Sequence, residues 1–301
     1  MKSSSKEGQV VSKTGVVIRY QTARANGVNV FYREAGDRNR PTIVLLHGFP
    51  TSSHMFRRLI PMLASKYHVV APDYPGFGAS EAPDQKAFDY SFENLAKTME
   101  AFLKELRIDR YSLYLMDYGA PIGFRLATSH PDRVQSLIIQ NGNAYIEGVG
   151  EVMKPIATYW ESPSSANAEP LKGLMRPDGV KFQYTAGTRA PELVSPDNWA
   201  VDLHYLARSG NVEIQLALLY DYRKNVALYP QWQEYLRTNQ PPTLIVWGKN
   251  DPFFTVPGAE GFRKDLKEVE LHFLDTGHFA LEEECEQISG RMLEFLARKV
   301  K

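Results

Sequence analysis

Apolar residues along the chain form short continuous runs that alternate with helically spaced stretches. Runs such as residues 42–46 and 243–247 are typical of strands that are buried on both faces of a parallel sheet. After Ser91, apolar residues recur at the three- and four-residue spacing of an amphipathic helix. The same criteria predict strands over 14–20, 28–34, 68–71, 111–116, 134–139 and 269–274, and helices over 54–65, 119–128 and 281–298. This alternation predicts an α/β fold, with a mainly parallel twisted sheet and helices on both of its faces.

The alternation is interrupted between residues 145 and 238. Prolines, tryptophans and tyrosines accumulate there, and helical patches such as residues 212–219 replace the strands. The pattern predicts a core of residues 14–144 and 239–301 and an inserted helical cap of residues 145–238. Residues 1–13 are polar and lack the apolar segment of a secretory signal, so we expect a flexible tail and a cytoplasmic protein.

A sharp turn follows the apolar run 111–116. Asp117 ends the run, and Gly119 opens a stretch that can form a helix. Strand, turn and helix in this order are typical of a nucleophile elbow, G-x-S-x-G, but here Asp117 takes the place of the serine and Leu115 that of the first glycine. A carboxylate can attack carbon and form an alkyl-enzyme ester, which water must then hydrolyse. The alternative is that Asp117 only caps the following helix.

Two further candidates also follow predicted strands, where the loops of an α/β sheet gather its function. Asp251 and His278 complete the order nucleophile, acid, histidine. We expect His278 to take a proton from the hydrolytic water and Asp251 to orient the imidazole and stabilise its charged form.

The loop of residues 47–50 follows another predicted strand. Backbone N–H groups of Phe49 and Tyr118 are the expected oxyanion hole for the Asp117 ester. We expect His47 to brace this loop through hydrogen bonds rather than to transfer protons.

The charge balance and the cysteine content limit the substrates, partners and structural class that are compatible with the chain. The chain has 35 Lys and Arg and 35 Asp and Glu, which favours a small neutral organic substrate over nucleic acid or an anionic membrane. The single cysteine, Cys285, excludes an intrachain disulfide framework. The histidines lack metal-ligand spacing, so we expect neither a metal nor another cofactor. The oligomeric state stays open at this point.

These motifs together resemble the α/β-hydrolase fold superfamily, in the branch of epoxide hydrolases and haloalkane dehalogenases. Residues 47–50 resemble its H-G-x-P motif, residues 73–80 its D-x-x-G-x-G-x-S loop and residues 116–119 its H-D-W-G elbow. The resemblance extends from residue 28 to the C-terminus. It implies a hydrolase that acts through an aspartyl-ester intermediate.

Departures from the family pattern bear on the substrate. Dehalogenases of this branch commonly hold the halide with an elbow Trp and a second donor, whereas this chain has Tyr118 and Phe49 at those places. Tyr222, before Arg223, is similar to the cap tyrosine with which epoxide hydrolases protonate the ring oxygen, but the same Tyr-Arg pair occurs in related dehalogenases. The missing halide donors make an epoxide the favoured substrate. A haloalkane dehalogenase remains the alternative, because Leu115 and the run after Pro50 are more dehalogenase-like. An esterase and a ligand-binding protein without turnover are further alternatives.

The remaining substrate contacts are expected among aromatic residues. The candidates are Phe49, Tyr118, Tyr159, Trp160 and Tyr145. Tyr159 and Tyr145 are also the candidates for a second acid. For cap aromatics, packing is the competing interpretation.

Overall fold

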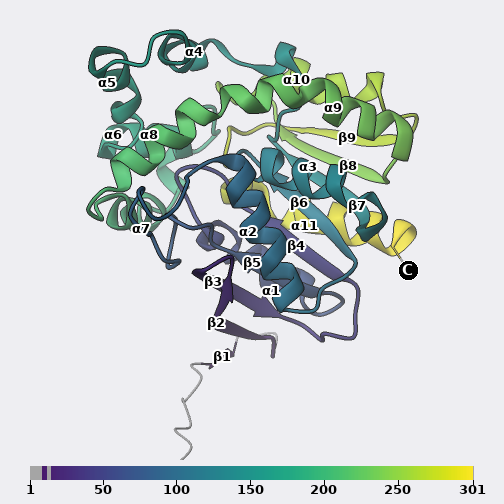
Figure 1. The fold of residues 1–301 in the computed structure, drawn as a ribbon. Coiled ribbons are helices and arrows are strands. Elements are labelled where there is room, and N and C mark those ends of the chain that lie inside the picture. Colours follow the sequence, from purple (N-terminus) through teal and green to yellow (C-terminus); the bar gives the residue numbers. More distant parts are fainter. Residues whose placement is uncertain (1–8, 12–14, 301) are drawn as a thin grey trace, which may run out of the picture.

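The computed structural model describes residues 9–11 and 15–300. The strands of this part form one sheet in the order β1-β2-β3-β5-β4-β6-β7-β8-β9 (Figure 1). The first three strands, β1 (Gln9–Val11), β2 (Val17–Ala25) and β3 (Val28–Ala35), run antiparallel to their neighbours. The other six are mutually parallel: β4 (Thr42–Leu46), β5 (His68–Pro72), β6 (Tyr111–Met116), β7 (Val134–Gln140), β8 (Thr243–Gly248) and β9 (Val269–Leu274). The predicted α/β class with a mainly parallel sheet is confirmed.

Helices cover the sheet because the central strands are apolar on both faces. Every residue of β4, β6 and β8 is buried. Helices α2 (Phe92–Glu105), α3 (Gly119–Ser129) and α9 (Arg223–Asn239) pack together on one side, and α1 (Leu59–Leu63) packs with α11 (Leu281–Lys299). As the sequence predicts, α2 begins after Ser91, whose side chain accepts a hydrogen bond from the Asn94 N–H group.

Two predicted segments differ in the structure. Of the predicted tail, residues 1–8 and 12–13 lie outside the described residues, but residues 9–11 form the edge strand β1, where the β-branched Val10 and Val11 favour an extended backbone. The predicted helix 54–65 is divided into a 3-10 turn, η1 (Ser53–Phe56), and α1. Pro61 explains the division, because it has no N–H group and its ring would clash with the Arg57 carbonyl of a continuous helix.

The inserted segment between β7 and β8 contains helices and no strand. Helices α4 to α8 lie together at one end of the sheet (Figure 1). By contrast, α9 runs back along the core, where its Trp232 stacks on Phe124 of α3 at 5.2 Å between ring centroids. The helices and 3-10 turns not yet given are η2 (Pro131–Arg133), η3 (Ile146–Gly148), η4 (Glu151–Met153), α4 (Lys154–Glu161), α5 (Ser165–Gly173), α6 (Pro177–Thr185), η5 (Pro191–Leu193), α7 (Asp197–Leu206), α8 (Asn211–Asp221), α10 (Val256–Gly261) and η6 (Phe262–Lys264).

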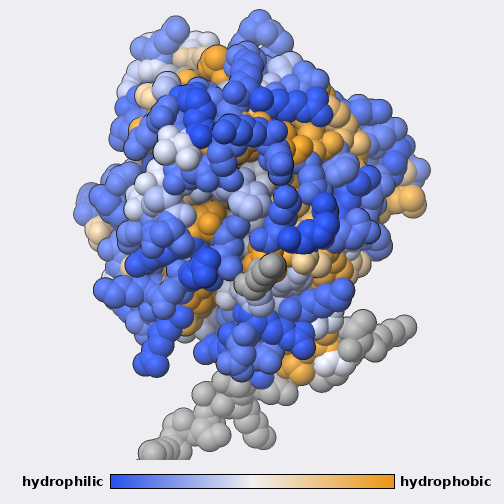
Figure 2. Space-filling view, turned by 90° about the vertical axis from the view of Figure 1, so that its right-hand side faces the viewer, coloured by the Kyte–Doolittle hydropathy of each residue, from blue (hydrophilic) through white to orange (hydrophobic). Residues whose placement is uncertain are grey.

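The surface is dominated by hydrophilic side chains on the face shown in Figure 2, where apolar side chains occupy smaller areas between them. Within the described residues, none of the helices combines the length and the apolar character that a membrane crossing requires.

The elbow packs tightly because two small residues face it. A Cβ atom on Gly119 would lie 2.2 Å from the Leu46 carbonyl oxygen, so only glycine lets α3 start this close to β4. A Cβ atom on Gly123 would lie 2.1 Å from Cδ2 of Leu115. Gly123 therefore makes the room for the bulky leucine that replaces the first elbow glycine.

This packing predicts that Gly123→Ala destabilises the protein, whereas Gly290→Ala does not. Both glycines lie in helices, where alanine gains up to about 1 kcal/mol in helix propensity, but an added Cβ at Gly290 meets nothing within 4 Å. Overpacking against Leu115 should make Gly123→Ala less stable than Gly290→Ala by about 1–3 kcal/mol in thermal or denaturant unfolding. In a Leu115→Ala background, Gly123→Ala should lose this penalty. Equal stability of the two single variants would contradict the packing argument.

Candidate functional site

Asp117 stands at the apex of the turn between β6 and α3. Its φ angle is +49°, in the left-handed region that a residue other than glycine rarely adopts. The neighbouring loop approaches so closely that a Cβ atom on Gly48 would lie 2.4 Å from the Asp117 Cβ. The strained turn thus presents the carboxyl group directly to the loop that follows β4.

Backbone N–H groups hold the Asp117 carboxyl group. The Phe49 N–H donates to Oδ1 at 2.6 Å, and the nearby Tyr118 N–H also favours the charged carboxylate. Burial raises the pKa of Asp117, while the His278 charge and these two donors oppose the rise. Helix α3 has no side-chain cap, so the structure contradicts the alternative in which Asp117 serves as one.

His278 and Asp251 lie beside Asp117. The His278 Nδ1 atom is 2.7 Å from Asp251 Oδ2, and Oδ1 of Asp251 accepts from the Phe253 N–H at 2.7 Å. The other imidazole nitrogen, Nε2, is 3.9 Å from Asp117 Oδ2, which is too long for a hydrogen bond. The loops after β6, β8 and β9 therefore bring the three predicted side chains together, with Nε2 directed toward the carboxylate.

The charge of His278 is controlled by its two carboxylate neighbours. Burial lowers the pKa of His278, but the Asp251 charge and hydrogen bond, together with the Asp117 charge, outweigh this effect and raise it overall. An imidazolium formed on His278 would thus be stabilised within a buried site.

Asn141 is a part of this arrangement that the sequence analysis did not identify. Its Nδ2 group donates to Asp251 Oδ2 at 2.8 Å, and its Oδ1 accepts from the Gly248 N–H at 2.9 Å. Its backbone carbonyl accepts from the Asp117 N–H at 3.3 Å. Asn141 directly follows β7, which lies between the strands of Asp117 and Asp251, and this position was the available signal.

His47 braces its loop, as the sequence predicts. Its Nδ1 atom donates to the Gly48 carbonyl at 2.9 Å, and its Nε2 atom accepts from the Tyr74 N–H at 3.3 Å. Burial lowers the pKa of His47 to about 3, so the ring is neutral in this role.

A small cavity is lined by Asp117 and His278. Its volume is about 30 Å³, which is enough for a water molecule or two. Apart from the candidate catalytic groups, its wall is mainly apolar and is supplied by cap helices and by the loop after β8: Met153, Ile156, Leu174, Leu219, Phe253 and Phe254. A substrate larger than water therefore requires side chains of this wall to move.

Two phenol groups from different elements line the cavity. Tyr118 follows Asp117, and Tyr222 lies between α8 and α9; their ring centroids are 6.0 Å apart. Both hydroxyl groups are buried. That of Tyr118 has no hydrogen-bond partner among the described residues, and that of Tyr222 lies near Tyr229 but outside hydrogen-bond geometry. Burial raises the pKa of Tyr222 well above its usual value, an effect that the nearby Tyr229 and Asp117 reinforce. Both phenols therefore remain protonated and can donate to a ligand.

The other predicted substrate contacts have different positions. Phe49 lines the cavity, but Trp160 lies behind Tyr222, with the two rings parallel within 5° and with its Nε1 group donating to the Leu219 carbonyl. Tyr159 packs against Tyr220, at 5.6 Å between centroids, and does not line the cavity. The structure therefore places Tyr159 and Trp160 outside the lining of this cavity, while Ile156 of the same helix lines it.

Tyr145 is also placed away from the cavity. Its hydroxyl group donates to Asp265 Oδ2 at 2.6 Å, and its ring packs on Phe262 at 4.9 Å. The prediction of Tyr145 as a substrate contact or second acid is therefore wrong, because its hydroxyl already has a carboxylate partner on the core. Another tyrosine, Tyr229, lies next to Tyr222. Its hydroxyl oxygen accepts a hydrogen bond from the Asn143 amide at 3.4 Å.

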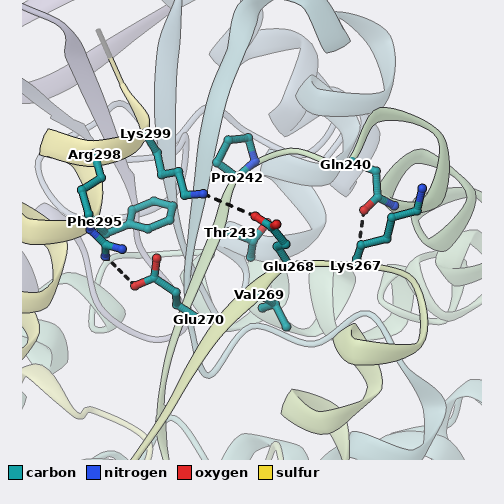
Figure 3. A pocket seen from close by; sticks show the side chains of 10 residues that line it. All are labelled: Gln240, Pro242, Thr243, Lys267, Glu268, Val269, Glu270, Phe295, Arg298 and Lys299. Atoms are coloured by element: carbon teal, nitrogen blue, oxygen red, sulfur yellow. Dashed lines mark hydrogen bonds and ion pairs between the residues drawn. The ribbon is translucent and has the colours of Figure 1, made fainter.

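A separate hollow of about 600 Å³ lies at the amino-terminal ends of β8 and β9 (Figure 3). Four of its charged side chains form ion pairs: Arg298 with Glu270 at 2.8 Å, and Lys299 with Glu268 at 3.5 Å. Among the residues that line this hollow, no nucleophilic side chain contacts a basic partner that could activate it. Among residues 9–11 and 15–300, no group of three or more His, Cys, Asp and Glu side chains is arranged so that it could bind a metal ion.

Comparison with known proteins supports the assignment of the fold. The family model described as the alpha/beta hydrolase fold matches residues 41–284. "Uncharacterized hydrolase YNR064C" of Saccharomyces cerevisiae is 42% identical over 94% of this chain and 99% of its own length. "Haloalkane dehalogenase 2" of Mycobacterium tuberculosis is 31% identical over 84% of this chain and 87% of its own length.

A solved structure has the same fold. The crystal structure of Cfl2 from Burkholderia cenocepacia superposes with a TM-score of 0.79 and 23% identity, covering 96% of this chain and 99% of that chain. The sheet order, the elbow and the family match lead to one conclusion: the chain belongs to the α/β-hydrolase fold family and is a hydrolase.

Proposed function

We propose that this hydrolase acts through a covalent aspartyl ester, with an epoxide as the favoured substrate. The observation that carries the proposal is the position of Asp117. Its carboxylate stands at the elbow apex, its Oδ1 accepts from the Phe49 N–H at 2.6 Å, and its Oδ2 lies 3.9 Å from His278 Nε2. No serine occupies the apex, which speaks against a serine esterase.

The first step would be attack by Asp117 Oδ2 on an epoxide carbon. Oδ1 is the oxygen held by the Phe49 N–H, so Oδ2 is free to form the new C–O bond while the ring C–O bond breaks. The ring oxygen becomes an alkoxide and takes a proton from Tyr222, which lines the same cavity. The product of this step is an alkyl ester of Asp117.

The second step would be hydrolysis of that ester. His278 takes a proton from water, and the hydroxide attacks the Asp117 carboxyl carbon while the N–H groups of Phe49 and Tyr118 stabilise the oxyanion. Collapse expels the diol alkoxide together with the original Oδ2, and His278 returns its proton to it. The proton left on the Asp117 carboxyl group restores the Tyr222 phenol, so one epoxide and one water give one diol.

The hydrogen-bond donors in the cavity favour an epoxide over a haloalkane. An opening epoxide needs a proton on its oxygen, and the buried, protonated Tyr222 hydroxyl, which lies beside Tyr229 at the cavity, can supply it. The Phe49 side chain offers no donor at the second halide-binding place. The mainly apolar wall supports a small neutral substrate.

A haloalkane is the second candidate. The relative named Haloalkane dehalogenase 2 is 31% identical to this chain, and the Tyr118 and Tyr222 hydroxyls could both donate to a halide. Halide displacement would use the same Asp117 ester and the same hydrolysis step.

His278→Gln should form the ester but not release it. Attack by a carboxylate removes no proton, whereas hydrolysis requires a base for water. After exposure to an epoxide panel, intact-mass spectrometry should detect one added substrate mass on the protein, and fragmentation should locate it at Asp117. The matched variant Asp117→Asn should gain no mass. Unmodified His278→Gln with retained activity would contradict the role of His278.

The wild-type enzyme should also accumulate the Asp117 ester at low pH. Hydrolysis needs neutral His278, so the ester fraction at steady state should increase as the pH falls through the pKa of His278 in the ester. There the Asp251 charge still raises this pKa, but the Asp117 charge is gone. Quenched-flow mass spectrometry between about pH 8 and pH 5 measures this fraction. An ester fraction that decreases toward low pH would argue against histidine as the base.

Tyr222→Phe should slow epoxide opening by roughly 10²-fold, the range for loss of one general acid. Halide displacement should be affected less, because the halide loses only one hydrogen bond of about 1 kcal/mol. Single-turnover ester formation with paired epoxide and bromoalkane substrates measures both effects.

Tyr159→Phe is the control for this experiment, since Tyr159 lies in the cap but does not line the cavity. It should open epoxides at the wild-type rate. If Tyr222→Phe also does so, another group donates the proton or the epoxide proposal is wrong.

A further inference from the structure

The cap contributes a polar side chain, Gln183, to an otherwise apolar part of the cavity wall. Gln183 lies on α6, is only 3% exposed and lines the same cavity as Asp117 and His278. The mechanism proposed above uses no amide at this position. A buried amide in such a wall needs hydrogen-bond partners, because an unpaired polar group is costly away from water.

Hydrogen bonds fix the orientation of this amide. The Gln183 Nε2 group donates to two backbone carbonyls, that of Leu174 at 2.8 Å and that of Gly179 at 3.1 Å. A flipped amide would direct its oxygen at both carbonyls, where it could not donate. The nitrogen is therefore satisfied, and Oε1 is the atom left to bind something else. Among the described residues, none donates a hydrogen bond to this oxygen.

The surroundings define which ligand group could bind Oε1. Leu174, Ile156 and Met153 belong to the same wall, and neither a lysine nor an arginine lines the cavity in the described part of the chain. A carboxylate or phosphate would meet an acceptor oxygen without a balancing cation. A neutral hydroxyl or N–H group would donate to Oε1 and satisfy it.

We propose that Gln183 Oε1 is a specificity contact that accepts a hydrogen bond from the substrate. The preferred substrates would then be small neutral molecules with a mainly apolar body, a reactive carbon for Asp117 and one hydroxyl or N–H donor at a fixed distance from that carbon. The epoxide as the reacting group rests on the proposed function, but the Gln183 contact would be the same for an alkyl halide. This substrate class deepens the proposed function and makes Gln183 a residue that selects among substrates.

Matched substrate pairs test the proposal. Terminal epoxides of three to six carbons and their ω-hydroxy counterparts differ only in the donor, so their kcat/KM ratio reports its contribution at each chain length. In the wild-type enzyme, the hydroxylated epoxide should be favoured by roughly tenfold at one chain length, the value for one additional hydrogen bond to the Gln183 amide oxygen. Because both substrates are measured on one protein, the ratio does not depend on the folded fraction.

Gln183→Met keeps a side chain of similar length without the acceptor, and it should bring the ratio to about 1. Gln215→Met is the matched control: Gln215 is also a buried cap glutamine, on α8, but it does not line the cavity. This control should keep the wild-type ratio. A wild-type ratio near 1 at every chain length, or a preference that survives Gln183→Met, would overturn the proposal.

A binding measurement separates this proposal from the proposed function. The diol and triol that correspond to each epoxide pair should raise the Tm of the wild-type protein differently, with the triol favoured, and Gln183→Met should remove the difference. If no epoxide is turned over but this binding preference is present, the epoxide reaction is wrong and the Gln183 contact stands. If epoxides are turned over, and neither the kcat/KM ratio nor the Tm difference depends on Gln183, the contact is wrong and the reaction stands.

Discussion

The 2.6 Å hydrogen bond from the Phe49 N–H group to Asp117 Oδ1 joins the two loops on which the candidate site depends. It forms only because Asp117 adopts a left-handed conformation at the elbow and because Gly48 and Gly119 allow neighbouring backbone to approach. The bond assigns different roles to the two carboxylate oxygens. One is bound by the Phe49 N–H, and the other faces His278.

The central strands hold the remaining groups in register. Asp251 and His278 follow β8 and β9, and Asn141, after β7, binds both the Asp251 carboxylate and the Asp117 backbone. Three neighbouring loops are therefore joined by hydrogen bonds that the parallel sheet positions. Burial strengthens these interactions, since charges attract one another more strongly where water is excluded.

The core could be predicted because its signals are local. Continuous apolar runs indicate buried parallel strands such as β6 and β8, and Asp117, Asp251 and His278 each lie at or within a few residues after the end of a parallel strand. The helical segment between β7 and β8 could not be predicted residue by residue, because which aromatic side chain faces the cavity depends on helix rotation and packing. Thus Tyr222 reaches the cavity, whereas Tyr145 is bound to Asp265. Asn141 was missed because an asparagine at a strand end is also an ordinary turn residue.

The central claim is that Asp117 forms an ester whose carboxyl carbon is attacked by water. A single turnover in ¹⁸O-enriched water, with enzyme in excess over an epoxide, tests it directly. Mass spectrometry of the Asp117 peptide and of the diol locates the heavy oxygen. The account predicts ¹⁸O in the Asp117 carboxyl group and none in the first diol, because the original Oδ2 leaves with the product. Heavy oxygen in the first diol and an unlabelled Asp117 would show direct attack by water on the substrate and would contradict it.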